Sequence, residues 1–161
     1  MLLYHGSNVA VEKPLLLDQT RGLDFGAGFY LTTSEEQAVR FSEIIIARRK
    51  SGAGTVSVYD FNDIGAEANL SIKRFEYADH DWLNFVTENR LKTYNGKMYD
   101  IVIGAVANDI VMPTLQAYLG GFLSKEATLM TLKTSKLVDQ YCLKTNNALS
   151  LLKFIKSYEA V

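Results

Sequence analysis

Apolar and polar positions change their period several times along the chain, which predicts a mixture of strands and helices without one repeating unit. Residues 55–61 (TVSVYDF) alternate in the manner of a half-buried strand. Residues 99–106 (YDIVIGAV) form a continuous apolar run, typical of a strand buried on both faces. Further strands are expected from Leu2 to Gly6, over 68–75 and over 138–144.

One helix is marked at both of its ends. Ser34 with Gln37 three residues on forms a capping box, and Glu35 and Glu36 suit the positive end of a helix dipole. Arg48, Arg49 and Lys50 suit the negative end, just before Gly52. A helix is therefore predicted between Ser34 and Gly52.

Other helices are expected from caps and apolar stripes. The pattern predicts a helix that is capped by Asp81 and presents Trp82, Phe85 and Val86 on one face. Two short helices are expected over 113–119 and over 125–133, the second capped by Ser124. Thr145 is expected to cap a final helix burying Ala148, Leu149, Leu152 and Ile155. Residues 12–28 have several turn formers and are expected to form a long loop. Because strands and helices do not alternate regularly, the fold class is predicted to be α+β.

Composition narrows the class of protein. A chain of 161 residues with two prolines and no Ser/Gly-rich linker predicts one domain over 1–161. A net charge of -1 argues against a protein that binds nucleic acid through a generally basic surface. Cys142 is the only cysteine, so no internal disulfide can form. The N-terminal MLLYHGS does not read as a secretory signal, and no apolar run reaches the roughly 20 residues of a membrane span. We therefore expect a cytoplasmic protein with no membrane association.

Several familiar sites are excluded. Gly26 and Gly28 suggest a dinucleotide fingerprint, but Leu31 replaces the third glycine and the helix begins only after Ser34. Two histidines and one cysteine are a poor donor set for zinc, so no metal site is expected. A nucleophilic pair of Cys142 with His5 stays open, although a lone cysteine in an apolar strand is usually buried and inert.

The tripeptide His5-Gly6-Ser7 falls where the first strand ends. It has two interpretations: a histidine with one hydrogen bond followed by a glycine turn, or a ligand site in which Gly6 exposes backbone between two polar side chains. The tripeptide alone does not choose between them.

Three segments together resemble the ADP-ribosyltransferase superfamily, in its diphtheria-toxin and poly(ADP-ribose) polymerase branch. They are HGS at 5–7, FGAGFY at 25–30 followed by a helix that carries Phe41, and the strand DQYCLKT that begins at Asp139. Over nearly its whole length the chain also looks like a bacterial family of that superfamily catalogued as a domain of unknown function. The resemblance implies a split mixed β-sheet core with flanking helices, and NAD as the substrate.

The resemblance also implies site residues. His5 would bind the adenosine ribose of NAD, while Gly6 and Ser7 would bind the nicotinamide amide. Tyr30 would stack on the nicotinamide ring, and the aromatic position eleven residues later falls on Phe41. Ordinary core packing is the alternative for both rings. Gly28 lies in the loop that presents Tyr30 and is assigned to the cofactor site. Arg21 in the preceding loop would meet the pyrophosphate as a bidentate donor, or is a solvated loop arginine.

The third position of the family triad falls on Gln140, where the polymerases have glutamate. An amide accepts a hydrogen bond from the ribose but gives less stabilisation of developing positive charge. Asp139 and Gln140 must point to opposite faces of a strand, and Gln140 is the residue expected in the site. His5, Tyr30 and Gln140 are thus the predicted catalytic residues.

The expected activity is NAD-dependent mono-ADP-ribosylation of a protein or nucleic-acid acceptor, as in a bacterial toxin or conflict effector with a neutralising antitoxin or immunity partner. In the superfamily the segment before the third motif shapes acceptor choice, and here it is 133–138 with Lys133 and Lys136. Asn108 and Asp109 either line the cleft or cap a helix. The alternatives are a non-catalytic NAD- or ADP-ribose-binding module and an NAD-dependent RNA 2′-phosphotransferase.

Overall fold

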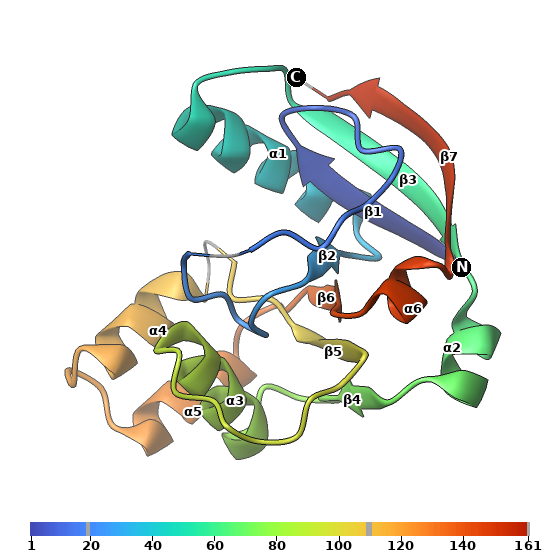
Figure 1. The fold of residues 1–161 in the computed structure, drawn as a ribbon. Helices are drawn as coiled ribbons and strands as arrows, with labels where there is room; N and C mark the ends of the chain where they lie inside the picture. The colour runs from blue at the N-terminus through green and yellow to red at the C-terminus, as the bar shows by residue number, and fades with distance from the viewer. Residues whose placement is uncertain (19, 109–110, 161) are drawn as a thin grey trace.

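Two β-sheets form the centre of the computed structural model, which describes residues 1–18, 20–108 and 111–160 (Figure 1). The first sheet has the order β1-β3-β7, with antiparallel neighbours. Its strands are β1 (Leu2–Ser7), β3 (Thr55–Phe61) and β7 (Leu152–Glu159). This sheet is called sheet A below.

The second sheet, sheet B, has the order β2-β6-β5-β4 and is mixed, because β4 and β5 are parallel while the other neighbours are antiparallel. Its strands are β2 (Phe29–Leu31), β6 (Asp139–Leu143), β5 (Ile101–Ala105) and β4 (Ile72–Arg74). A single bridge between Tyr4 and Thr32 links β1 to β2. Beyond that bridge, the two sheets separate.

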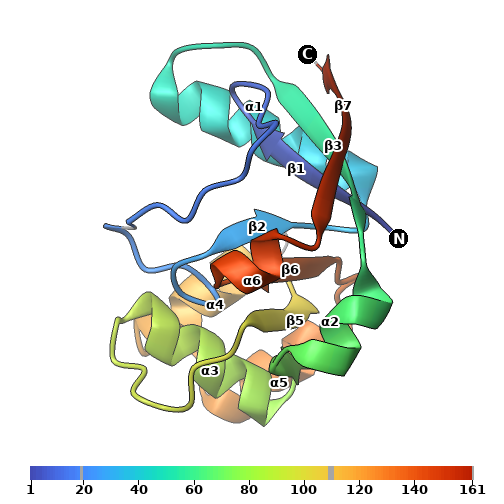
Figure 2. The same ribbon diagram turned by 45° about the vertical axis from the view of Figure 1, so that its right-hand side comes forward.

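Helices cover the outer sides of both sheets (Figures 1 and 2). Helix α1 lies on sheet A, and α3, α4 and α5 lie against sheet B, while α2 and α6 are short connections. The helices are α1 (Glu35–Arg49), α2 (Asp63–Asn69), α3 (His80–Arg90), α4 (Met112–Leu119), α5 (Lys125–Lys133) and α6 (Asn146–Leu149).

The buried side chains follow this layering. One cluster between sheet B and its helices includes Trp82, Val102 and Leu115. A second cluster, with Leu3 and Ile103, is shared by the two sheets, and a small third cluster lies between α1 and sheet A. At about 25 cal/mol per Å² of buried apolar surface, these clusters are the main favourable term in folding. The α+β class predicted from the sequence is confirmed.

Caps predicted from the sequence define several helix starts. Ser34 Oγ accepts from Gln37 N at 3.2 Å, Ser124 Oγ accepts from Ala127 N, and Thr145 Oγ1 accepts from Ala148 N. Each bond satisfies one of the four amide groups left unpaired at a helix start. The Ser34 amide donates to Thr32 Oγ1.

The predicted final helix is wrong. Only the single turn of α6 follows Thr145, and 152–159 form strand β7 on the edge of sheet A. Leu152 and Ile155 have helical spacing to Ala148, but the segment LKFIKSYE pairs with β3, and Ile155 is 48% exposed at the bulge in that pairing. Tertiary pairing therefore overrides the local pattern.

Two smaller predictions are also corrected. The N-cap of α3 is Asp79, which accepts from Trp82 N, and Asp81 lies in the first turn. The expected strand at 68–75 is shortened to β4, because Asn62 caps α2 and that helix continues to Asn69. Within the part of the chain that the structure describes, no helix has the length and apolar character to cross a bilayer.

Candidate functional site

His5 joins the two sheets at the point where they separate. The Nδ1 atom of His5 on β1 lies 2.7 Å from the carbonyl oxygen of Tyr30 on β2. A carbonyl oxygen can only accept, so Nδ1 carries the proton in this bond. In the neutral ring, Nε2 is then an acceptor for a hydroxyl or amide group.

The ring of His5 is hydrogen-bonded to the Tyr30 carbonyl at its edge and packs against Phe29 with its face. It stacks on the Phe29 ring with centroids 4.3 Å apart. Burial lowers the pKa of His5 from 6.5 to about 4, with a smaller contribution from the Arg49 charge and a partial offset from the Tyr30 hydrogen bond. His5 is therefore neutral at physiological pH.

Gly6 is the closest contact between β1 and α1. A Cβ placed on Gly6 would lie 2.0 Å from the Ala38 carbonyl oxygen, so the helix requires glycine here. Tyr4 exchanges hydrogen bonds with Thr32, the residue directly after β2, at 2.9 and 3.0 Å. Groups two residues apart on a strand point the same way, so the Gly6 N–H and C=O also face the β2 side.

Ser7 is buried at the end of β1. Its Oγ donates weakly to Asn8 Oδ1, which also accepts from Arg49 Nη1 at 3.0 Å. The sequence therefore brings the polar end of β1 to the C-terminal end of α1.

Tyr30 has its side chain on the opposite face of β2 from Phe29 and Leu31, whose side chains enter the core shared by the two sheets. The Tyr30 ring packs against the cluster under α3 to α5. Its hydroxyl donates to Gly26 O at 2.6 Å and accepts from Phe25 N at 3.0 Å. Burial raises the pKa of Tyr30 well above 10, so it stays protonated.

Gln140 shares that face of sheet B with Tyr30. Tyr30 is opposite Cys142 in the β2–β6 ladder, and Gln140 lies two residues before Cys142 on β6. Asp139 points to the other face, where its carboxylate accepts from the Thr33 amide and hydroxyl at 2.9 and 2.7 Å. This opposition is the one expected from strand alternation.

The Gln140 amide belongs to a buried charged network. Gln140 Nε2 lies 2.9 Å from Asp24 Oδ2 and 3.3 Å from Ala105 O. Asp24 Oδ1 pairs with Arg90 through Nη2 at 2.5 Å and Nε at 2.6 Å, and the Ala107 amide donates to Oδ2 at 3.0 Å. Asp24 and Gln140 are both 6% exposed.

The glycine loop between Asp24 and Phe29 has its own support. Gly26 has φ 79°, a left-handed conformation that favours glycine. A Cβ on Gly28 would lie 2.4 Å from Cys142 Sγ, so glycine lets this loop pack on β6. Lys144 Nζ donates to the carbonyls of Phe25 and Ala27 at 2.6 and 2.8 Å.

Phe41 lies on α1 and is 37% exposed, so its ring is not wholly in the core. Within the described ranges, no ring contact joins it to Tyr30. Arg21 is exposed in the long loop, and burial together with the charges of Arg48 and Arg90 lowers its pKa. The Arg21 guanidinium therefore lies within the electrostatic range of Arg48 and of Arg90.

Cys142 and His5 do not form a nucleophilic pair in this fold. Cys142 is fully buried beside Tyr30, and burial raises the pKa of its thiol to about 11. His5 instead lies on the face shared with Phe29. Asn108 Oδ1 accepts from the Val111 amide at 3.3 Å, but Val111 is the N-cap residue of α4 and that helix start has no side-chain cap bond, while Asp109 lies outside the described residues.

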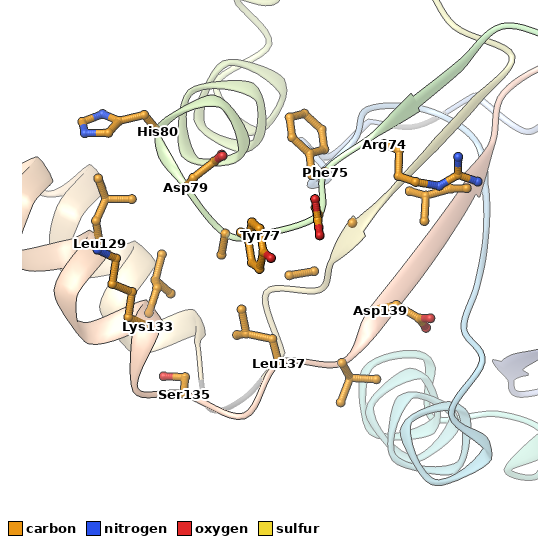
Figure 3. A pocket seen from close by; sticks show the side chains of 17 residues that line it. Arg74, Phe75, Tyr77, Asp79, His80, Leu129, Lys133, Ser135, Leu137 and Asp139 are labelled. Atoms are coloured by element: carbon orange, nitrogen blue, oxygen red, sulfur yellow. The ribbon is translucent and has the colours of Figure 1, made fainter.

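A cavity of about 800 Å³ lies beside the start of β6 (Figure 3). Its lining combines Leu129 and Lys133 of α5, Tyr77 and His80 around the start of α3, and Leu137 before β6. Gly104 and Ala105 of β5 also line it. Gly104 pairs with Gln140 and Ala105 O accepts from it, so this cavity adjoins the predicted third catalytic position.

The structure brings together some predicted residues and not others. His5 and Tyr30 meet through the Tyr30 backbone, and Tyr30 and Gln140 share a face of sheet B. A second cavity of about 110 Å³ lies beside β4 and β5, and neither of these two cavities has His5, Tyr30, Phe41 or Gln140 among the described residues that line it. That the rings of Tyr30 and Phe41 flank one cleft stays a prediction.

Sequence reasoning missed Asp24, Arg90 and Lys144. Asp24 directly precedes the FGAGFY segment and Lys144 directly follows the DQYCL strand, so adjacency to a motif was the available signal. Arg90 gave no comparable signal, since an arginine in the last turn of a helix is ordinarily solvated. Among the described residues, no group of three or more His, Cys, Asp or Glu side chains could hold a metal ion.

The family of the chain is shown by its match to a family model. Residues 1–154 match the model described as protein of unknown function (DUF3990), and the chain belongs to that family. No curated protein and no solved structure matches the chain.

Proposed function

We propose that this protein is an NAD-dependent mono-ADP-ribosyltransferase. The observation that carries the proposal is the convergence of three sequence segments that are far apart in the chain. His5 bonds to the backbone of Tyr30, and Tyr30 shares a sheet face with Gln140. Core packing alone does not require a neutral histidine, an aromatic ring and a buried amide at this junction.

The strand order supports an ADP-ribosyltransferase-like split sheet. Joined through the Tyr4–Thr32 bridge, the two sheets give the continuous order β4-β5-β6-β2-β1-β3-β7, and the split falls between β2 and β1. The candidate residues lie on the two sides of that split. The edge of β1 with the Gly6 N–H and C=O offers one donor and one acceptor, the pair needed by a primary amide such as that of nicotinamide.

In the proposed reaction, the bond between the nicotinamide nitrogen and the ribose carbon breaks, and nicotinamide leaves with the electron pair. The ribose carbon becomes oxocarbenium-like, and an acceptor nucleophile supplies an electron pair and loses its proton. Tyr30 would hold the nicotinamide ring, His5 Nε2 would accept from a hydroxyl of the adenosine ribose, and Gln140 would accept from the other ribose. Arg21 beside Arg48 would face the pyrophosphate. No group of the protein has to transfer a proton in the first step.

The cavity of about 800 Å³ is proposed as the place where the acceptor binds. It adjoins β6 at Gln140, and its walls include Lys133, Ser135 and Leu137 from the segment assigned to acceptor choice. A lining that combines apolar and polar side chains suits an aromatic or apolar side chain, or a nucleobase, carrying a nucleophile. A protein with this activity would act as a bacterial toxin or conflict effector controlled by a neutralising partner.

The test is incubation of purified protein with NAD labelled in the adenosine half and with bacterial lysate, followed by mass spectrometry of protein and nucleic acid. We expect a mass increase of one ADP-ribose on a macromolecule and release of nicotinamide. The variants His5→Ala and Tyr30→Ala should abolish both. Label that persists unchanged in both variants would contradict the site assignment.

A second candidate, a NAD- or ADP-ribose-binding module without catalysis, is favoured by one observation. The amide of Gln140 is neutral and its nitrogen is engaged by Asp24 and Ala105. Calorimetric binding of NAD without release of nicotinamide would favour this module over the enzyme.

A further inference from the structure

Asp24 is saturated by donors. Arg90 supplies two N–H groups to Oδ1, while the Ala107 amide and Gln140 Nε2 each supply one to Oδ2. A carboxylate has about four acceptor positions, and donors from four directions leave no place for a proton. Asp24 therefore acts only as a hydrogen-bond acceptor in this network.

The orientation of the Gln140 amide follows from that chemistry. Both groups near Nε2, the Asp24 carboxylate at 2.9 Å and the Ala105 carbonyl at 3.3 Å, are acceptors. The nitrogen has two protons, one for each. If the amide were flipped, its oxygen would face two other oxygens inside the protein, where unpaired polar groups cost most. Oε1 is consequently turned away from Asp24.

We propose that Asp24 is a positioning residue that fixes Gln140 as a hydrogen-bond acceptor, and that glutamine is the working residue at this position because Asp24 is there. The proposal rests on the proposed function and deepens it. Oε1 of Gln140 would accept a hydrogen bond from a sugar hydroxyl. The carboxylate of the site is that of Asp24, which lies behind the Gln140 amide and is paired with Arg90.

A glutamate at this position would not improve the site. Its carboxylate would meet that of Asp24 at the distance of a hydrogen bond, with both side chains 6% exposed. Two like charges so close cannot both stay ionised in a buried site. The protonated acid would donate to Asp24 as the amide does. A glutamate variant should therefore regain stability as the pH falls.

The charged and titratable groups around this pair come from three elements. Arg90 belongs to α3, Tyr30 to β2 and Cys142 to β6, and Lys144 follows β6. Burial holds Tyr30 and Cys142 in their neutral forms near pH 7. A comparison between pH 5 and pH 8 therefore tests the introduced glutamate together with the Asp24 carboxylate that it would face.

The experiment compares Gln140→Glu, Asp24→Asn and the double variant by thermal unfolding at pH 5 and pH 8, and by nicotinamide release from NAD. At pH 8 we expect Gln140→Glu to lower Tm by about 10 °C and to slow nicotinamide release by at least about tenfold. At pH 5 the Tm deficit should shrink by about half or more. The double variant should unfold at a higher temperature than the sum of the single changes predicts.

Gln116→Glu on the exposed side of α4 is the matched control, since it adds the same charge outside the network. Its Tm should stay within about 2 °C of wild type at both pH values. A Gln140→Glu protein as stable as wild type at pH 8, or strictly additive double-variant effects, would overturn the proposal. A wild type that never consumes NAD while the Tm pattern holds would refute the enzymatic function and leave the Asp24–Gln140 pair standing.

Discussion

The imidazole of His5 and the backbone carbonyl of Tyr30 are hydrogen-bonded across the gap between two sheets, 2.7 Å apart. The bond ties β1 to the middle of β2, next to the Tyr4–Thr32 bridge that links the two sheets. The side chain of His5, itself a candidate site residue, thus helps to fix the backbone position of Tyr30, a second candidate.

The two nitrogens of His5 can be separated by substitution. Asparagine at position 5 places an amide nitrogen near Nδ1 and keeps the bond to Tyr30 O, whereas glutamine reaches the Nε2 position. We expect His5→Asn to fold with a Tm within a few degrees of wild type and to lose about three- to tenfold in NAD affinity. Calorimetry and thermal unfolding measure the two effects. Unchanged NAD affinity in His5→Asn would remove Nε2 from the site.

Stability should fall in acid through His5. Its pKa in the folded protein, about 4, is below the unfolded value of 6.5, so the unfolded chain binds the extra proton first. The contribution of His5 to the free energy of unfolding is therefore fully present above pH 6.5. It falls as the pH is lowered, and about 3 kcal/mol is lost near pH 4. Urea unfolding at pH 7 and pH 4.5 measures this loss. The loss should be smaller in His5→Asn and unchanged in a His80→Gln control.

The hydroxyl and the ring of Tyr30 have separate roles. Tyr30→Phe leaves the Gly26 carbonyl and the Phe25 amide without their partner, and we expect a loss of about 1 to 3 kcal/mol in unfolding free energy. Nicotinamide release at saturating NAD should remain within about threefold of wild type, since the ring is kept. Tyr30→Ala should abolish it. Equal activity losses in the two variants would show that the hydroxyl, not the ring, is what matters.

Phe41 should contribute to ligand binding and little to folding. Because its side chain is 37% exposed, Phe41→Ala is expected to lower Tm by only a few degrees. Loss of a stacking contact should weaken NAD binding by about three- to tenfold. Phe122→Ala is the control, as Phe122 is an 87% exposed phenylalanine outside the candidate site. Equal NAD affinity in both variants would place Phe41 outside the site.

The cavity beside β6 gives a test of the acceptor that is independent of NAD cleavage. Tyr77 lines this cavity and is 67% exposed, so Tyr77→Ala should leave folding intact. We expect labelling of the acceptor to fall by about tenfold, while hydrolysis of NAD to nicotinamide stays within about twofold. An equal loss of both reactions would mean that Tyr77 supports the NAD site instead.

Local signals account for much of the fold. Ser34, Ser124 and Thr145 cap helices where the sequence predicts them, because a capping bond depends on residues only three apart. The alternation over 55–61 gives the bounds of β3. Strand β7 was missed because its apolar spacing fits a helix, and only its pairing with β3 decides otherwise.

From the sequence, the candidate site could be predicted only as a set of residue positions, without the contacts between them. The resemblance to the ADP-ribosyltransferase superfamily indicates Tyr30, Phe41 and Gln140 as positions, but the partner of the Gln140 amide depends on a contact between the start of β6 and a loop more than a hundred residues earlier. Burial of the Asp24 charge is likewise a property of the folded chain, since carboxylates are ordinarily exposed. The chemistry of position 140 therefore needs the structure.

Lys144, directly after β6, determines the polarity of the glycine loop. Its ammonium group is bound by the Phe25 and Ala27 carbonyls, so this turn directs oxygens inward around a positive charge. A phosphate cradle has the reverse polarity, with amide hydrogens converging on an anion. The loop therefore binds the ammonium group of its own lysine, and its carbonyl groups serve a cation contact rather than a phosphate contact.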